Sequence, residues 1–258
     1  MNGLRVERKG VIGRITLARR EHQNAIDREM AEGMFTALQT LEKDNQVRIV
    51  HLTGDGDDFS VGTDLEAMNR IINDAGDAQR QDAEALGRVY LAARSLMKPV
   101  VCSVRGRALG AGAGLSLACD LSLAHQDAEF GFPEVRMGFV PAIIMTMLRR
   151  TLGEKRATDL VLTGRIINAE EAGNIGLVSR VLPAASFDAD VDAVLAGLSG
   201  SSATSLALTK WLLYKLDSLS FEDGIAAGIV TDVEARATDD FRAALKRQLG
   251  ANGPAGGQ

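Results

Sequence analysis

The hydrophobic pattern at the start of the chain predicts a β-hairpin, a helix and a further strand. Apolar residues flank a Lys9-Gly10 turn within residues 3–18, as they do in two paired strands. Asp27 precedes a run in which apolar residues recur every three or four positions, which predicts a helix capped by this aspartate. Residues 47–53 are again mostly apolar and predict the next strand.

Strands and helices continue to alternate up to residue 186. Asp64 follows Gly62-Thr63 and is expected to cap a helix, and residues 79–97 predict a longer one. Residues 100–104 are apolar and β-branched, which is typical of a buried strand. The remaining predicted elements are a strand at 121–124, helices at 142–150 and 154–162, a short helix capped by Asn168 and a strand at 177–182.

Beyond residue 186 the pattern is helical only. Helices are predicted at 187–199, 202–217, 220–238 and 239–249, and the final GPAGGQ is expected to be disordered. These helices carry more apolar surface than one small core needs, which indicates packing on another subunit. We therefore divide the α/β chain into a core (residues 1–186), a helical oligomerisation region (187–250) and a disordered tail (251–258).

Composition narrows the class of protein. The 258 residues are 46% hydrophobic and 24% charged, as in ordinary globular enzymes, and the net charge of −5 with no basic run argues against a nucleic-acid partner. We expect neither a signal peptide nor a membrane span, because no basic-apolar leader and no apolar run of ~18 residues occurs. Cys102 and Cys119 are expected to be buried free thiols. A cytoplasmic enzyme is the resulting expectation.

The first candidate for chemistry is the glycine-rich stretch after the strand at 100–104. It runs Gly110-Ala111-Gly112-Ala113-Gly114 and leads into a helix, so backbone amides at the helix start are free and unobstructed by side chains. Such amides can stabilise a negatively charged oxygen, which predicts an anion or oxyanion site at residues 110–112. Two alternatives are a turn that only allows close packing and a dinucleotide site, although the glycines lack G-x-G-x-x-G spacing.

The second candidate is Glu134, which lies between Pro133 and an apolar run. A carboxylate in such surroundings would be partly desolvated and would have a raised pKa, as suits an acid or base. The alternative is a surface glutamate after a proline. Asp55, Asp57 and Glu66 fall at positions of a calcium loop, but Ser60 occupies the required glycine position, so we predict no metal site. His51 is interpreted as a tolerated strand residue.

Five segments together resemble the crotonase (enoyl-CoA hydratase/isomerase) family along nearly the whole chain. They are ITLARREHQNAID, DDFSVGTDL, KPVVCSVRGRALGAGAGLSLACDL, AEFGFPEVRMGFVPA and GEKRATDLVLTGRIINAEEAGNIGLVSRVLP, in the family's order and spacing. The resemblance implies a spiral of ββα repeats with a C-terminal helical trimerisation region, assembled as a homotrimer or homohexamer.

The resemblance also implies an acyl-CoA thioester substrate, with coenzyme A as part of the substrate and no separate cofactor. By matching position, the backbone amides of Thr63 and Ala111 would form the oxyanion hole that holds the enolate. The family commonly has an alanine at the position of Thr63. The resemblance tolerates this difference, because the backbone amide and not the side chain would bind the oxygen. Contacts to coenzyme A and substrate, mostly through the backbone, are implied at His22, Asn24, Ala25, Gly62, Asp64, Leu65 and Gly110. For His22 the residues themselves favour the alternative of a plain exposed loop histidine.

One departure from the family bears on the reaction. Hydratases of the family use two glutamates; the second matches Glu134, and the first falls at Gly114, which has no side chain. A single carboxylate suffices to move a proton between C2 and C4, so the residues favour isomerisation of 3-enoyl-CoA to 2-enoyl-CoA. The alternatives are a hydratase that uses another acid, other acyl-CoA chemistries of the fold (hydrolase, decarboxylase or dehalogenase) and a catalytically silent acyl-CoA-binding member.

Overall fold

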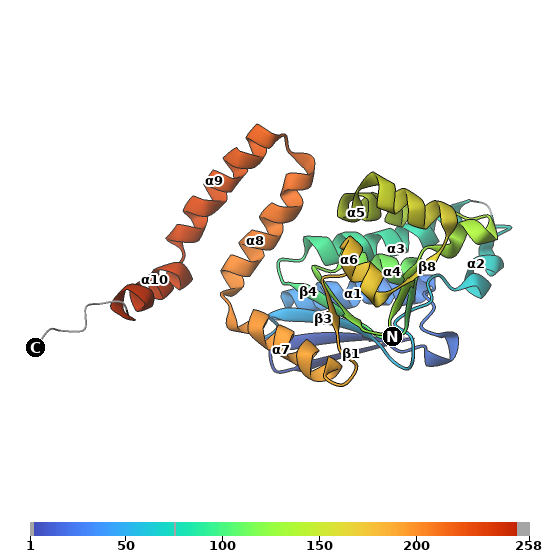
Figure 1. The fold of residues 1–258 in the computed structure, drawn as a ribbon, viewed down its shortest axis with the longest axis horizontal. Coiled ribbons are helices and arrows are strands. Elements are labelled where there is room, and N and C mark those ends of the chain that lie inside the picture. Colours follow the sequence, from blue (N-terminus) through green and yellow to red (C-terminus); the bar gives the residue numbers. More distant parts are fainter. Residues whose placement is uncertain (1–2, 75, 252–258) are drawn as a thin grey trace, which may run out of the picture.

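A computed structural model describes residues 3–74 and 76–251, and its centre is a six-stranded sheet (Figure 1). In spatial order its strands are β1 (Leu4–Lys9), β2 (Ile12–Leu17), β3 (Ile49–Gly54), β4 (Val100–Val104), β6 (Leu121–His125) and β9 (Arg180–Leu182). All neighbours are parallel except the β1–β2 hairpin. A second sheet contains β5 (Arg107–Leu109), β7 (Glu129–Gly131) and β8 (Ile166–Asn168).

Helices cover both faces of the large sheet, which explains its nearly continuous apolar strands. The helices that pack around the two sheets are α1 (Arg28–Lys43), α2 (Leu65–Ile71), α3 (Asp77–Ser95), α4 (Ala111–Ala118), α5 (Ala142–Thr163), α6 (Ala169–Ile175) and α7 (Phe187–Gly200). Because side chains alternate along β3, Val50 joins the main core with α1, α3 and α4, whereas Ile49 packs with Val101 against Phe187 of α7. The buried side chains thus fall into two layers, one on each side of the sheet.

Most predicted elements are confirmed, and so are their caps. Asp27, Asp64 and Asn168 each accept a hydrogen bond from a backbone amide in the first turn of their helices. The two helices predicted at 142–150 and 154–162 form α5, which is interrupted at Gly153 with φ 73° and ψ 171°. Cys102 and Cys119 are buried and free, as predicted.

Two local predictions are wrong. The chain does not turn directly from β4 into α4, because the short strand β5 intervenes and pairs in parallel with β7. Three residues are too few to show an alternating pattern, so sequence periodicity could not reveal β5. The strand predicted at 177–182 begins only at Arg180, since the Leu177 amide still closes the end of α6 by donating to the carbonyl of Ala172.

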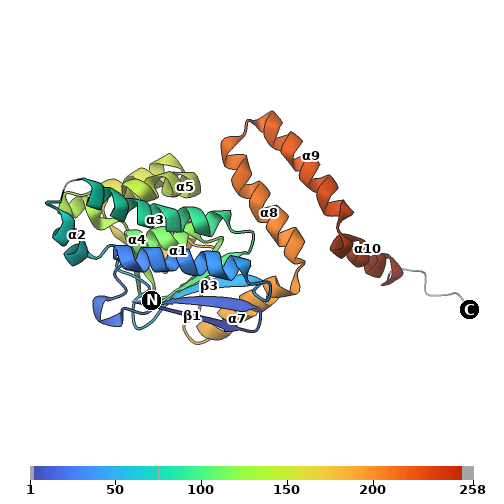
Figure 2. The same ribbon diagram turned by 180° about the vertical axis from the view of Figure 1, so that it is seen from behind.

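Three helices extend from the core as an arm (Figures 1 and 2). They are α8 (Ala203–Lys215), α9 (Phe221–Ala237) and α10 (Asp239–Ala251). A buried ion pair of 2.7 Å between Lys210 and Asp120 attaches α8 to the core. The division at residues 186 and 187 stays a prediction, and α7 packs on the large sheet. Ala251, the first residue of the predicted tail (251–258), is the last residue of α10, and residues 252–258 lie outside the described residues.

Within residues 3–74 and 76–251, no single helix is long and apolar enough to cross a membrane. Among the described helices, one pair, Phe187–Gly200 and Ala203–Ser218, bent by 101°, reaches the required length and apolar composition together.

Candidate active site

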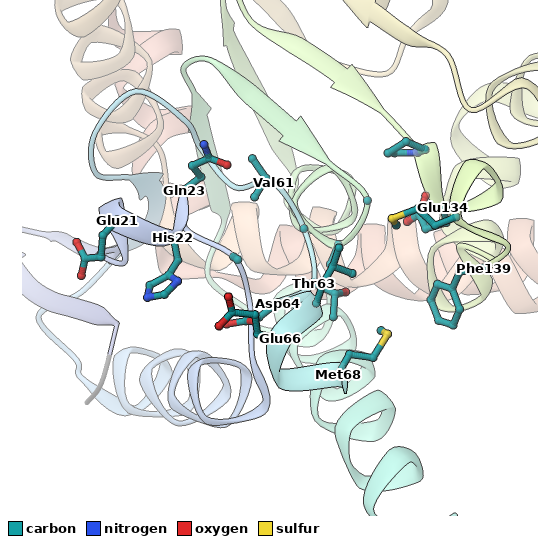
Figure 3. A pocket seen from close by; sticks show the side chains of 17 residues that line it. Glu21, His22, Gln23, Val61, Thr63, Asp64, Glu66, Met68, Glu134 and Phe139 are labelled. Atoms are coloured by element: carbon teal, nitrogen blue, oxygen red, sulfur yellow. The ribbon is translucent and has the colours of Figure 1, made fainter. Parts of the chain in front are cut away.

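A cavity of 490 Å³ opens where several loops of the core meet. The loop before α1, the loop between β3 and α2, the turn before α4 and the 3-10 helix Pro133–Met137 form its walls. Figure 3 shows Glu21 and His22 at one end, Glu134 and Phe139 at the other, and Thr63 and Met68 between them. Each strand of a parallel sheet delivers its following loop to the same edge, which is why segments far apart in sequence converge here.

The amides of Thr63 and Ala111 are free to bind a ligand. Neither has a hydrogen-bond acceptor in the described part of the chain. The bridge between the Thr63 loop and Ile26 uses the neighbouring Gly62 carbonyl and Asp64 amide, and Ala111 is the first residue of α4, where amides have no acceptor within the helix. A Cβ added to Gly62 would lie 2.8 Å from the Leu109 carbonyl oxygen, so the two loops are in close contact. The paired loops therefore have the arrangement expected of a two-amide oxyanion site.

Glycine is required beside each of the two amides. Gly62 has φ +100° and Gly110 has φ +48°, both in the left-handed region that favours glycine. A Cβ at Gly110 would also lie 2.8 Å from Oε1 of Glu134. The glutamate is thus directly beside the turn that presents the Ala111 amide.

Glu134 is buried, so its interpretation as a surface glutamate is wrong. Its exposed fraction is 9%, and burial raises the pKa of its carboxyl above the ordinary value. Among the described residues, Oε2 of Glu134 has no hydrogen-bond partner. A buried carboxylate with a free oxygen, lining a cavity beside two free amides, is suited to accept a proton from a bound molecule.

A second cavity, of 240 Å³, adjoins the first. The two share five lining residues, Thr63, Met68, Ala111, Glu134 and Phe139. Most other walls of the second cavity are apolar and come from α3 and from the segment between Phe139 and Ile144. The amides and Glu134 therefore lie at the junction of a wide outer cavity and a narrower, largely apolar inner one.

The space beside Gly114 is filled by another side chain. A Cβ at Gly114 would lie 2.5 Å from the hydroxyl oxygen of Tyr90 and 3.0 Å from Cγ1 of Ile144. Tyr90 is fully buried on α3 and donates a 2.9 Å hydrogen bond to the Ala111 carbonyl. Burial, and secondarily the charge of Glu134, raise the pKa of the Tyr90 phenol, so it keeps its proton and remains a donor.

A buried polar network holds the outer loops in place. Arg19 bridges Asp64 at 2.7 Å and Asp27 at 3.0 Å, which joins the caps of α2 and α1. Burial acts to raise the pKa of Asp64, but the Ala67 amide and Arg19 outweigh it and hold that pKa below its usual range. Asp64 is therefore an ionised structural group, although it lines the outer cavity.

The structure brings together most of the residues implied by the resemblance. His22, Ala25, Gly62, Asp64, Leu65 and Gly110 line the outer cavity with Thr63, Ala111 and Glu134. Asn24 does not: it is fully buried, and its side-chain amide donates to the carbonyls of Asp55 and Asp58. Its positive φ of 55° and these bonds shape the loop, so its side chain has a structural role.

Sequence reasoning missed several residues of the site. Tyr90 belongs to no motif, yet a phenol on a buried helix face needs a hydrogen-bond partner, and that need is a signal that the sequence offers. Asp82, Leu86 and Phe139 line the inner cavity without any motif to mark them. His51 is buried and hydrogen-bonded to Ser103 at 2.8 Å, and burial lowers its pKa to about 4. It is a strand residue, as predicted.

No cluster of three or more candidate metal ligands occurs in the described part of the chain.

The fold and these loops define a class of protein, and comparisons with known proteins agree on it. The family described as "Enoyl-CoA hydratase/isomerase" matches residues 7–248. A Thermus thermophilus protein whose name contains the words enoyl-CoA hydratase is 37% identical over 238 residues, covering 92% of this chain and 94% of that protein. The solved structure of an enoyl-CoA hydratase from Mycobacterium smegmatis superposes with a TM-score of 0.93 at 26% identity, covering 98% of each chain.

A further solved structure, of an enoyl-CoA hydratase from Polaromonas sp., has a TM-score of 0.92 at 26% identity and covers 97% of this chain and 98% of that one. The chain belongs to the enoyl-CoA hydratase/isomerase family and is an enzyme of the crotonase superfamily.

Proposed function

We propose that this protein is an acyl-CoA isomerase that converts 3-enoyl-CoA to 2-enoyl-CoA with Glu134 as its only acid/base. The outer cavity would receive coenzyme A, the amides of Thr63 and Ala111 would bind the thioester oxygen, and the inner cavity would receive the acyl chain. The junction of the two cavities at Glu134 supports this placement, because the reacting carbons follow the thioester directly.

The single observation that carries the proposal is the position of Tyr90. Its hydroxyl occupies the space that a side chain at Gly114 would need, and the phenol is kept neutral by burial. A second carboxylate therefore has no room at Gly114, where the family's hydratases have one. Glu134 remains beside the two amides as the acid/base group.

The reaction needs one carboxylate and a site that holds negative charge. Ionised Glu134 takes a proton from C2, and the C2–H electron pair spreads over the dienolate, whose oxygen accepts hydrogen bonds from the Thr63 and Ala111 amides. Protonated Glu134 then returns the proton to C4, and the double bond moves from C3=C4 to C2=C3. No atom is gained or lost, and Glu134 ends ionised as it began.

Glu134→Gln tests the proposal. The amide keeps the shape of the carboxyl but cannot take the proton, so turnover of 3-hexenoyl-CoA should fall by about 10²–10⁴-fold. Binding of hexanoyl-CoA, measured by calorimetry, should stay close to wild type. Glu129→Gln is the matched control, since this nearby glutamate is exposed and lines neither cavity. Undiminished turnover in folded Glu134→Gln would place the chemistry elsewhere.

The pH dependence gives a second readout. Burial raises the pKa of Glu134, and the base must be ionised, so kcat should fall as the pH drops through this raised pKa. The acidic limb should lie above the ordinary range of an exposed glutamate, about 4.3. An acidic limb at or below that value would contradict the assignment of Glu134 as the base.

Hydration of 2-enoyl-CoA is the second candidate reaction, because the names of the relatives contain the words enoyl-CoA hydratase. It predicts rapid addition of water to 2-hexenoyl-CoA by the wild-type protein with little isomerisation. A protein that binds acyl-CoA but turns over neither substrate would instead be a silent member of the family.

We also propose a homotrimer or homohexamer built through the arm. Ile229 and Val233 of α9 are 62% and 61% exposed, four residues apart on one helix face. Replacing both with Asp should lower the mass measured by light scattering at micromolar concentration to that of a monomer. Leu162→Asp, at an equally exposed position of α5, should leave the mass unchanged. A monomeric wild-type protein would contradict this proposal.

The expectations of a cytoplasmic location and of no cofactor stay predictions.

A further inference from the structure

The peptide unit that carries the Ala111 amide lies between two anchored peptide units. On its N-terminal side, the Gly110 amide donates a 2.9 Å hydrogen bond to the Gly131 carbonyl of β7. On its C-terminal side, the Ala111 carbonyl accepts a 2.9 Å hydrogen bond from the Tyr90 hydroxyl of α3. Because the Ala111 amide has no acceptor within the described residues, these two anchors set its direction.

The loop that carries the Thr63 amide is anchored in a different way. The Ile26 amide donates to the Gly62 carbonyl at 2.8 Å, and the Ile26 carbonyl accepts from the Asp64 amide at 2.9 Å. Backbone bonds therefore hold this loop on both sides of Thr63. In the turn before α4, one of the two anchors is instead a side chain, that of Tyr90. Its hydroxyl is the group through which a substitution can loosen one amide and leave the other in place.

The hydroxyl of Tyr90 does more than supply a partner to a carbonyl. Ala111 is the first residue of α4, where a carbonyl already accepts the ordinary helical bond from the amide four residues further on. Tyr90 lines neither cavity, so the phenol does not contact a bound molecule. Its bond links the first turn of α4 to α3 through a side chain that is only 3% exposed. Such a buried link restricts the movement of the turn.

The turn depends on contacts of this kind for its exact shape. A glycine on each side of Ala111 gives the backbone more conformational freedom than other residues would. An oxyanion donor acts only within about 3 Å of the developing charge, and a displacement of about 1 Å can lower a rate by about 100-fold. The position of the Ala111 amide must therefore be fixed from outside the turn.

We propose that Tyr90 is a positioning residue, whose hydroxyl fixes the first turn of α4 and thereby directs the Ala111 amide at the thioester oxygen. It acts through Ala111 and does not contact the substrate. The inference rests on the proposed function only in placing the thioester oxygen at the Thr63 and Ala111 amides. It holds for isomerisation and for hydration alike, because both develop negative charge on that oxygen.

Infrared spectroscopy of a bound thioester tests the inference without turnover. Hydrogen bonds to a carbonyl oxygen weaken the C=O bond, so hexanoyl-CoA with an isotopic label at its thioester carbonyl should show a lower stretching frequency on the wild-type protein than in solution. Tyr90→Phe removes one oxygen atom and keeps the ring that fills the space at Gly114. Its frequency should lie between those two values, while the Kd of hexanoyl-CoA from calorimetry should stay close to wild type.

Turnover gives a second readout. In Tyr90→Phe, kcat for 3-hexenoyl-CoA should fall by about 3- to 10-fold with a smaller change in KM, as expected for one neutral hydrogen bond that acts mainly in the transition state. Tyr90→para-aminophenylalanine returns an N–H donor to the same position and should restore both the frequency and kcat. Tyr214→Phe is the matched control, because it removes the other tyrosine hydroxyl of the chain, which donates to Asp120 at 2.8 Å where the arm begins. It should change neither readout.

Three outcomes would overturn the inference alone. They are an unchanged carbonyl frequency in Tyr90→Phe, a loss that para-aminophenylalanine does not restore, and an equal loss in Tyr214→Phe, which would indicate a general effect on stability. A wild-type frequency equal to that in solution would contradict the placement of the thioester at the two amides, and with it both proposals. If the frequency changes as expected in a protein that hydrates 2-hexenoyl-CoA and does not isomerise, the inference stands and the proposed isomerase alone is wrong.

Discussion

Helices around the active site and helices of the arm bury their residues to very different extents. All eight residues of α4 are buried, whereas Thr231 is the one buried residue described in α9. Helix α4 packs against α3, α5 and strands of both sheets, while α9 contacts α8 and α10. Side chains such as Phe221 and Ile229 therefore remain exposed on the arm. The difference shows that α4 is packed on all sides within one chain, whereas α9 leaves a large apolar surface exposed, as the proposed oligomer would require.

The junction between these regions is polar and buried. The ammonium of Lys210 on α8 pairs with Asp120 and also donates to the carbonyls of Ala93 and Lys98. Tyr214 donates to the other oxygen of Asp120 at 2.8 Å. Fixed groups on both sides hold the first helix of the arm in one orientation on the core.

The largest expected effect comes from breaking this junction. Lys210→Met leaves the Asp120 charge buried without its cation, which should lower the free energy of unfolding by about 3–5 kcal/mol. Urea unfolding followed by circular dichroism measures the loss. Lys215→Met, at an exposed position of the same helix, should change stability by about 0.5 kcal/mol or less. A loss below ~1 kcal/mol for Lys210→Met would show that the ion pair does not hold the arm.

The second prediction compares the same substitution, alanine to proline, at the start of α4 beside the site and at the start of α8 in the arm. Ala111 and Ala203 are each the first residue of a helix, where proline is tolerated. Ala111→Pro removes the proposed oxyanion amide and should lower kcat by about 10²–10³-fold, whereas Ala203→Pro should leave kcat unchanged. Ala111→Gly keeps the amide and should retain most activity. Near wild-type turnover in folded Ala111→Pro would remove this amide from the site.

A smaller effect is expected at Gly114, where the core has no spare room. Gly114→Ala would place its Cβ 2.5 Å from the Tyr90 hydroxyl, and such overpacking should destabilise the protein by about 1–3 kcal/mol. Gly197→Ala on α7, with no atom within 4 Å, should instead be neutral or stabilising by up to about 1 kcal/mol. Thermal unfolding distinguishes the two. A stable Gly114→Ala variant would contradict the filled space on which the single-acid proposal depends.

The smallest effect is expected at His22, which is exposed at the outer end of the first cavity. His22→Ala should weaken binding of free coenzyme A by about 10-fold or less, the equivalent of one ordinary hydrogen bond, and leave kcat unchanged. Gln23→Ala, in the same wall, is the comparison variant. A 100-fold loss of affinity would make His22 a principal contact for coenzyme A.

Features that depend on neighbouring residues or on a local motif could be predicted from the amino-acid sequence. The caps at Asp27 and Asp64, the apolar strands, the arm helices, and the glycines beside Thr63 and Ala111 could all be predicted this way. Local reasoning succeeds here because a cap, a left-handed turn or an amphipathic face is decided within a few residues. It also identified Glu134 as a candidate, although the alternative of a surface glutamate stayed open.

The side chains that lie opposite these residues could not be predicted, because they depend on how separate elements pack. Tyr90 and Gly114 are 24 positions apart on different helices, and the packing of α3 against α4 brings the phenol into the space at Gly114. Asp82 has no motif, and it lines the inner cavity together with Phe139 and Ile143, which come from a separate segment. Helical periodicity predicts that a residue faces inward, but the partner that it meets depends on how separate elements pack, which no local pattern encodes.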